Sequence, residues 1–148
     1  MMKALKCTVI VILFFLLTSF SVLKEYDAVL YMLPRNDETL CAVKKKIYAS
    51  DNADFCEKVI LEMTSQKNSS YIPLVAQNTK TSVEKSTAVV DFSSSTLPRE
   101  IETIYSLVNS LTSTGDIITV EFTVNGEKKA DFFKNTSIYE TFIPDYNI

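Results

Sequence analysis

Residues 118–126, which read ITVEFTVNG, decide the predicted fold. From Ile118 to Val124 every second residue is apolar and the residues between are polar, which is the pattern of a strand that buries one face. The dipeptide Asn125-Gly126 follows, the strongest short-range hairpin signal, typical of a type I′ turn. The stretch predicts a strand, a tight turn and a returning strand over Glu127–Phe133.

A helix is predicted directly before this strand. Its apolar residues recur at three- and four-residue steps: Ile101, Ile104, Tyr105, Val108 and Leu111. Pro98 is expected in the first helical turn, where proline is tolerated, and Gly115 at a left-handed C-terminal cap. Before the helix, Thr87–Phe92 (TAVVDF) alternates as another strand, which a turn at Lys85-Ser86 joins to the residues preceding it.

The amino-terminal half is predicted to contain two strands followed by a helix. Ala28–Leu33 and Thr39–Tyr48 are predicted as two strands separated by a polar turn, and Ala53–Gln66 as an amphipathic helix capped from Ser50-Asp51-Asn52. Tyr71–Thr81 shows no clear period and is expected to be irregular. The predicted class is α+β: one mostly antiparallel sheet with two helices packed on one face, preceded by an N-terminal membrane helix.

The first 25 residues predict export. Cys7–Leu23 carries no charge and as a helix would span roughly 25 Å, the short end of a transmembrane segment. Lys3 and Lys6 precede it, so the positive-inside rule leaves them in the cytoplasm and sends the rest outward. We favour an uncleaved anchor over a cleaved signal peptide, and the cysteine at the start of the run does not fit a lipoprotein signal. The expected division is residues 1–25 as signal or anchor and residues 26–148 as one domain, on the outer face of the cytoplasmic membrane or secreted after cleavage.

Composition argues against several classes of function. Of 15 lysines and arginines two lie in the leader, which leaves 13 against 18 acidic residues in the exported part. An acidic domain of this kind is unsuited to nucleic acid. Histidine is absent, which removes the commonest general base and metal ligand. We therefore predict no enzyme activity, no catalytic residues, no metal and no cofactor.

Motifs that could carry chemistry are sparse. Ser82 and Lys85 match the S-x-x-K of penicillin-interacting serine enzymes, but they lie in an expected hairpin and the companion motifs are missing. Glu100 and Glu102 stand two apart on a helix and cannot face one another, and a pair of Asp91 with a helical glutamate has nothing to single it out. These carboxylates are interpreted as solvated charge.

Three further features have structural interpretations. Cys41 and Cys56 either form a disulfide outside the cell or remain free thiols, and we favour free thiols. The run Lys44-Lys45-Lys46 is typical of an exposed or edge-protecting strand. The triplets Asn68-Ser69-Ser70 and Asn135-Thr136-Ser137 would be glycosylated only in a eukaryotic secretory route.

A family resemblance covers most of the exported part. Ala88–Ser93 (AVVDFS), Ile104–Thr112 (IYSLVNSLT) and Ile117–Lys128 resemble the GerMN domain of sporulation and germination proteins, with a looser agreement of strand and helix order over Ala28–Met63. The resemblance implies a spore-forming bacterial source and a module similar to the ring-building motifs of secretion systems. No catalytic residues are known for the family, and Asn109 is expected to cap the helix or hold the turn after it. The sequence has Lys67-Asn68-Ser69-Ser70 where the family usually has a connection rich in proline and glycine.

The predicted function is that of a non-enzymatic, membrane-anchored interaction module. It would help to assemble or localise a sporulation, germination or cell-wall complex, with envelope or sporulation-complex proteins as partners and a homo-oligomer as one form. The alternative is a module that binds peptidoglycan or another wall polymer, through tyrosines stacked on sugars if several line one groove: Tyr71, Tyr105, Tyr139 and Tyr146. An envelope hydrolase is the third and weakest hypothesis, because it requires a cleft with convergent polar groups.

Overall fold

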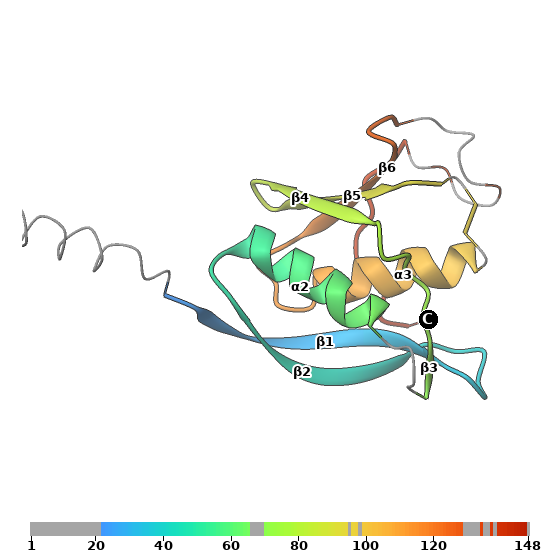
Figure 1. Cartoon of the computed structure of the whole chain (residues 1–148), viewed down its shortest axis with the longest axis horizontal. Coiled ribbons are helices and arrows are strands. Elements are labelled where there is room, and N and C mark those ends of the chain that lie inside the picture. Colours follow the sequence, from blue (N-terminus) through green and yellow to red (C-terminus); the bar gives the residue numbers. More distant parts are fainter. Residues whose placement is uncertain are drawn as a thin grey trace, which may run out of the picture.

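The computed structural model describes residues 22–65, 70–94, 96–97, 99–128, 134, 137 and 139–147. Within these described residues, two helices and six strands follow one another (Figure 1). They are β1 (Lys24–Pro34), β2 (Cys41–Ala49), α2 (Asn52–Thr64), β3 (Tyr71–Ile72), β4 (Lys80–Glu84), β5 (Thr87–Phe92), α3 (Glu100–Leu111) and β6 (Thr119–Val124). Strand β1 begins at Lys24, inside the stretch assigned to the leader by sequence, and Tyr71–Ile72 is a strand in the segment predicted to be irregular.

The strands form two sheets, which corrects the predicted single sheet. One sheet has the order β2-β1-β3 and the other the order β4-β5-β6. Both helices lie between them, with β1 and β2 on one side and β4, β5 and β6 on the other (Figure 1). The α+β class is confirmed, but the helices are covered on two sides instead of resting on one face of one sheet.

The pairing is mostly antiparallel, as predicted, but the second sheet contains one parallel pair. β4 and β5 form the expected antiparallel hairpin, in which Lys85 adopts a φ of 58°. β5 and β6 instead pair in parallel, from Thr87↔Thr119 to Phe92↔Val124. The helix α3 connects them and carries the chain back along the sheet, so that both strands run in the same direction.

The turn at Asn125-Gly126 is confirmed, and its expected partner strand falls outside the described residues beyond Lys128. Asn125 has a φ of 52° and Gly126 a φ of 76°, and the backbones of Val124 and Glu127 bond each other across the turn. A different segment continues the pairing of β6: Phe142 forms an antiparallel bridge with Val120, through bonds of 2.8 and 2.9 Å. Phe142 thereby packs the carboxyl-terminal segment against the core of the domain.

Helix α2 has the predicted amphipathic character. Asp51 is its N-cap, because the Asp51 side chain accepts a bond of 2.9 Å from the amide of Asp54. Its buried residues face the interior between the sheets: Phe55, Cys56, Val59, Ile60, Met63 and Thr64.

Helix α3 is buried around most of its circumference, not along one stripe as predicted. Thr103, Ser106, Asn109 and Ser110 are enclosed together with the apolar positions, whereas Ile101, assigned to the stripe, is half exposed. The helix begins at Glu100, later than predicted, and Pro98 itself lies outside the described residues. Gly115 has the expected positive φ of 79°, but it closes a turn three residues beyond the C-cap Thr112.

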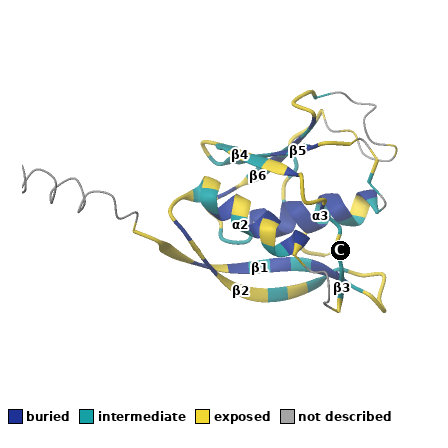
Figure 2. Cartoon of the chain, viewed as in Figure 1, coloured by how far each residue is buried: buried dark blue, intermediate teal, exposed yellow. Residues whose placement is uncertain are grey.

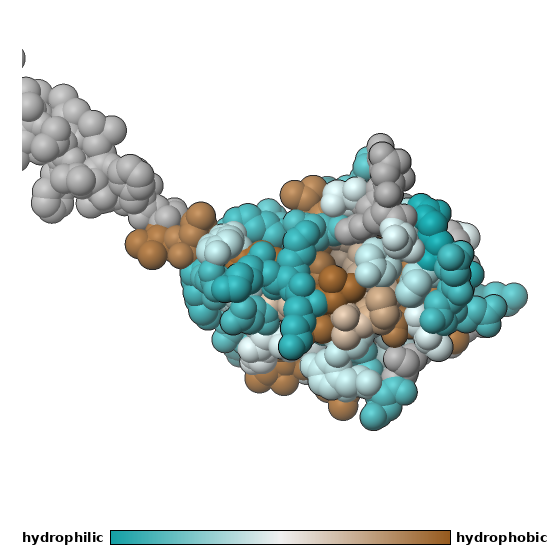
Figure 3. Space-filling model, turned by 90° about the horizontal axis from the view of Figure 1, so that it is seen from below, coloured by the Kyte–Doolittle hydropathy of each residue, from teal (hydrophilic) through white to brown (hydrophobic). Residues whose placement is uncertain are grey.

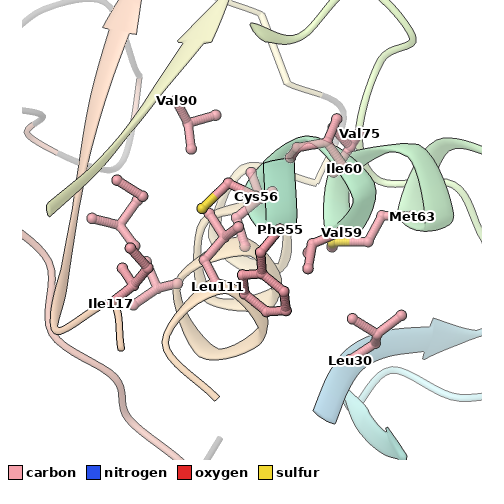
Figure 4. Close-up of a cluster of buried hydrophobic side chains, with 14 of the residues drawn as sticks. Leu30, Phe55, Cys56, Val59, Ile60, Met63, Val75, Val90, Leu111 and Ile117 are labelled. Carbon is pink, nitrogen blue, oxygen red and sulfur yellow. The ribbon is translucent and has the colours of Figure 1, made fainter. Parts of the chain in front are cut away.

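The core fills the space between the two sheets. In Figure 4, side chains of α2 point toward Leu111 of α3, with Leu30 of β1 on one side and Val90 of β5 on the other. Tyr26 stacks on Phe55 with ring centroids 4.7 Å apart, and Phe122 meets Phe142 edge to face at 5.2 Å. Figure 2 shows the same layering, in which buried residues line the helices and the inward faces of the strands. Of the apolar positions predicted from Ile118 to Val124, only Ile118 is exposed, because the chain enters β6 one residue later and buries Ile117 in its place.

Polar side chains of α3 and of the turn directly after it cover the free edge of β1. Ser110 accepts a bond of 2.8 Å from the amide of Tyr31, Ser106 donates to the carbonyl of Tyr31, and Ser113 accepts from the amide of Val29 at 3.1 Å. The three serines recur at helical spacing, so they form one row against the strand. The row supplies the backbone groups of β1 with partners that a neighbouring strand would otherwise provide.

The predicted membrane segment lies outside the described residues as far as residue 21. Within the part of the chain that the structure describes, neither helix has the length and apolar character needed to cross a membrane.

Candidate functional site

The S-x-x-K residues do not form a catalytic arrangement. Ser82 lies in β4 and Lys85 in the turn after it, and both are exposed. The chemistry requires the serine at a helix start with the lysine one turn later, so the hairpin separates the groups that would have to cooperate.

The candidate carboxylates hold the fold together. Asp91 accepts bonds of 2.6 Å from the hydroxyl of Thr123 and 2.7 Å from the amide of Gly126, and so fixes the end of β6. Buried Glu100 accepts a bond of 2.9 Å from the amide of Lys134. Glu102 pairs with Arg99, one helical turn away, at 3.4 Å. None of these three faces another as an acid and base would.

The described part of the chain contains neither a reactive cysteine pair nor a metal-binding site. Cys41 lies on β2 and Cys56 on α2, and both are free thiols, as favoured from the sequence. Burial raises the pKa of the Cys56 thiol to about 12, so the nucleophilic thiolate is scarce at neutral pH. Among the residues described, no group of three or more histidine, cysteine or acidic side chains is placed to hold a metal ion.

The four tyrosines proposed to stack on sugars come from separate elements. Tyr71 belongs to β3, Tyr105 to α3, and Tyr139 and Tyr146 to the carboxyl-terminal segment. Tyr146 approaches Tyr31 of β1, with ring centroids 5.8 Å apart. None of the four lines either of the two surface hollows described below.

Asn109 has a role that the sequence only approximated. Its side chain is fully buried on α3, donates a bond of 2.5 Å to the carbonyl of Asp145 and accepts one of 3.0 Å from the amide of Asp145. The residue thus holds the carboxyl-terminal segment, and neither caps its own helix nor secures the turn that follows.

Two surface hollows stand out among the residues that the structure describes. The first is a groove of about 340 Å³ between α2 and β4, which we call the α2–β4 groove. Its helical wall carries Glu57, Ile60, Leu61 and Thr64, and its other wall is formed by Gln77, Thr79, Lys80 and Thr81. Leu61 is 65% exposed at its rim, and the hydroxyl oxygens of Thr79 and Thr81 are buried without a hydrogen-bond partner in the described chain. Sequence reasoning missed this groove because its residues come from elements that no local pattern places side by side.

The second hollow, of about 500 Å³, lies along β1 and β2 and is lined by Asp27, Ala28, Val29 and Lys44-Lys45-Lys46. Figure 3 shows this side of the molecule, with a small apolar area bordered by hydrophilic side chains. Two of the lysines are engaged, Lys45 by Glu62 and Lys46 by Glu25. The lysine run is exposed on an edge strand, as the sequence predicted.

A family model matches more than half of the chain. The model of the Germane family, described as sporulation and spore germination, matches residues 29–130. A search of the curated proteins gives no significant match.

Three solved structures share the fold. The tandem GerMN domains of the sporulation protein GerM from Bacillus subtilis are 19% identical at a TM-score of 0.57, covering 86% of this chain and 48% of that one. The first GerMN domain of the same protein is 15% identical at 0.54, with 83% and 97% covered. A predicted lipoprotein from Clostridium perfringens is 14% identical at 0.52, with 80% and 87% covered. The chain spans about half of the tandem protein, which corresponds to one of its two domains.

Proposed function

Since this chain belongs to the Germane family of sporulation and spore germination proteins, we propose that it is a non-enzymatic interaction module of the cell envelope. It is held at the outer face of the cytoplasmic membrane by its apolar leader and helps to assemble or localise a sporulation, germination or cell-wall complex. The family match over residues 29–130 carries this proposal.

Two observations support a binding role over a catalytic one, and a third supports the proposed location. The carboxylates that could act as acid and base are occupied by structural hydrogen bonds, as at Asp91 and Glu100. The surface hollows are lined by side chains suited to contact, such as exposed Leu61. The location is supported by the uncharged run Cys7–Leu23 and by solved relatives that include GerM and a predicted lipoprotein.

Deletion of the gene in the bacterium that encodes the chain tests the role. We expect fewer heat-resistant spores or slower germination, restored by the full-length gene. Spores of normal number, resistance and germination rate in the deletion strain would contradict the proposal. A fusion of the chain to an enzyme active only outside the cytoplasm checks the location: an inactive fusion would refute the outward orientation.

Binding of a wall polymer is a second proposal, favoured by the lysine-bordered hollow on β1 and β2. Lys44 has no ion pair with another described residue and is free to meet an anionic polymer. The test is co-sedimentation of the full-length protein with purified cell walls, with Lys44→Glu as the variant. Equal sedimentation of the variant and the natural protein would rule out this use of the hollow.

A further inference from the structure

We propose that the α2–β4 groove binds an extended segment of a partner protein, which adds to the second sheet as a strand beside β4. The segment carries an apolar side chain that packs on Leu61 and a basic side chain that reaches Glu57. This inference deepens the proposed function, because it names the surface and the kind of partner through which the module would act.

The hydrogen-bond pattern of β5 shows which backbone groups of β4 are open. The carbonyls of Ser86 and Phe92 accept bonds from Ile118 and Asn125 at the β6 side, at 2.8 and 2.9 Å. Because successive residues of a strand turn their backbone groups to opposite edges, the odd-numbered residues of β5 face β4. Their register partners are Glu84, Ser82 and Lys80.

The residues between these partners, Thr81 and Val83, therefore direct their amides and carbonyls away from β5. β4 is the end strand of its sheet, and no other described residue bonds these four groups. These amides and carbonyls recur every second residue, which is the spacing of the amides and carbonyls along one edge of another extended strand. The ligand that can hydrogen-bond all of them is therefore an extended polypeptide.

Every other long edge in the described structure is covered or guarded. The edge of β1 is covered by Ser106 and Ser110 of α3, by Ser113 in the turn after α3, and by β3. The edge of β6 pairs with Phe142, and the edge of β2 carries Lys44-Lys45-Lys46, which is how natural proteins discourage strand addition. β4 has a single lysine, Lys80, and neither a proline nor a covering element beside Thr81 and Val83.

The helical wall of the groove selects the side chains of the segment. Leu61 is 65% exposed beside buried Ile60, which suits an apolar side chain on the face of the added strand that looks toward α2. Glu57, one turn earlier on the same wall, forms no ion pair with another described residue and attracts a basic side chain. The buried hydroxyls of Thr79 and Thr81, which lack partners, are two further polar groups at the floor that an added backbone would satisfy.

The test uses the full-length protein in detergent micelles and a phage library of random peptides. The tightest peptides are synthesised, and hydrogen–deuterium exchange is followed with and without them. We expect selected peptides to carry apolar and basic residues and to slow exchange over residues 80–84 about tenfold. Failure to select any peptide, or protection over β2 instead, would overturn the proposal. Protection of residues 80–84 that appears without peptide as the protein concentration rises would also overturn it, by identifying a second copy as the occupant.

Two matched pairs of variants locate the site. Thr81→Pro removes an outward amide of β4, and Lys44→Pro does the same on β2; proline is tolerated where the amide faces solvent. Leu61→Asp changes the groove, and Ile101→Asp changes an equally apolar, exposed side chain of α3. We expect the first member of each pair to weaken peptide binding about tenfold and the second to leave it unchanged. Equal affinity of Leu61→Asp and Ile101→Asp would refute the groove even if the proline variants fail to fold.

The two proposals fail differently. If the deletion strain sporulates poorly and Leu61→Asp restores it fully, the groove is refuted and the proposed function stands. If the deletion strain is normal, the proposed function is refuted, and the peptide measurements alone decide the groove.

Discussion

Replacing Ser110 by alanine tests how α3 protects the edge of β1. Ser110 is fully buried, and its hydroxyl accepts the amide of Tyr31 at 2.8 Å. The substitution leaves this amide without a partner in a part-buried site, which costs about 1–3 kcal/mol. Alanine favours the helix by roughly 0.5 kcal/mol relative to serine, so the net loss of unfolding free energy is about 0.5–2.5 kcal/mol.

The assay is guanidinium unfolding of the full-length protein in micelles, followed by far-ultraviolet circular dichroism because the chain has no tryptophan. The control is Ser82→Ala, which removes the same hydroxyl from an exposed position of β4 and should change stability by less than about 0.5 kcal/mol. If Ser110→Ala loses no more stability than Ser82→Ala, the row of serines does not protect the strand and the interpretation of α3 is wrong.

Three further predictions follow from single groups. Asn109→Ala should raise the rate of hydrogen exchange at the amide of Asp145 about tenfold without loss of helix, whereas Asn147→Ala should not raise it. Equal exchange rates in the two variants would contradict the role of the Asn109 side chain in holding the backbone of Asp145. In a Cys7→Ser background at pH 8, iodoacetamide should alkylate Cys41 and spare Cys56 until the protein unfolds, because burial raises the pKa of Cys56 to about 12; equal rates would refute this burial. Hydrogen bonds from the amide of Ser50 and from Lys58 lower the pKa of Asp54 in the folded protein. Ionised Asp54 therefore stabilises the fold at pH values above the pKa of an unfolded aspartate, and this stabilisation is lost as the pH falls through the lowered pKa of the folded state. The midpoint temperature of thermal unfolding should therefore fall as the pH is lowered below about 4, and it should fall less steeply in Asp54→Asn. The same dependence of the midpoint on pH in both proteins would exclude this contribution.

The local elements could be predicted because their signals are local. The alternation in Thr87–Phe92, the positive φ at Asn125-Gly126 and the capping by Asp51 each depend on a few neighbouring residues, and each is found where the sequence placed it. The division into two sheets could not be obtained in this way. Whether β5 and β6 pair in parallel depends on the path of α3 between them, which the alternation within either strand does not encode.

The candidate groove was out of reach for the same reason. Leu61 reads as one more exposed residue on the polar side of α2, and Thr81 as part of an ordinary hairpin strand. Only the packing of α2 against the open edge of β4 brings them together. Hydrophobic periodicity describes residues close together in the sequence and does not report contacts between distant segments. Reasoning from a single sequence therefore identifies α2 and β4 as elements but not the surface that they form together.

The polar residues of α3 carried information that the apolar stripe concealed. Ser106, Asn109 and Ser110 are short, and each bonds a backbone group of another segment: Tyr31 for the two serines and Asp145 for the asparagine. A helix meant to face water would favour longer charged side chains, whereas small hydroxyls and amides let a backbone approach closely and still satisfy it. The chain thus uses α3 to close the edge of β1 and to hold the segment whose Phe142 closes β6. Because the fold covers these two edges and guards a third with lysines, the open backbone of β4 beside Leu61 is the edge through which a protein partner can add a strand.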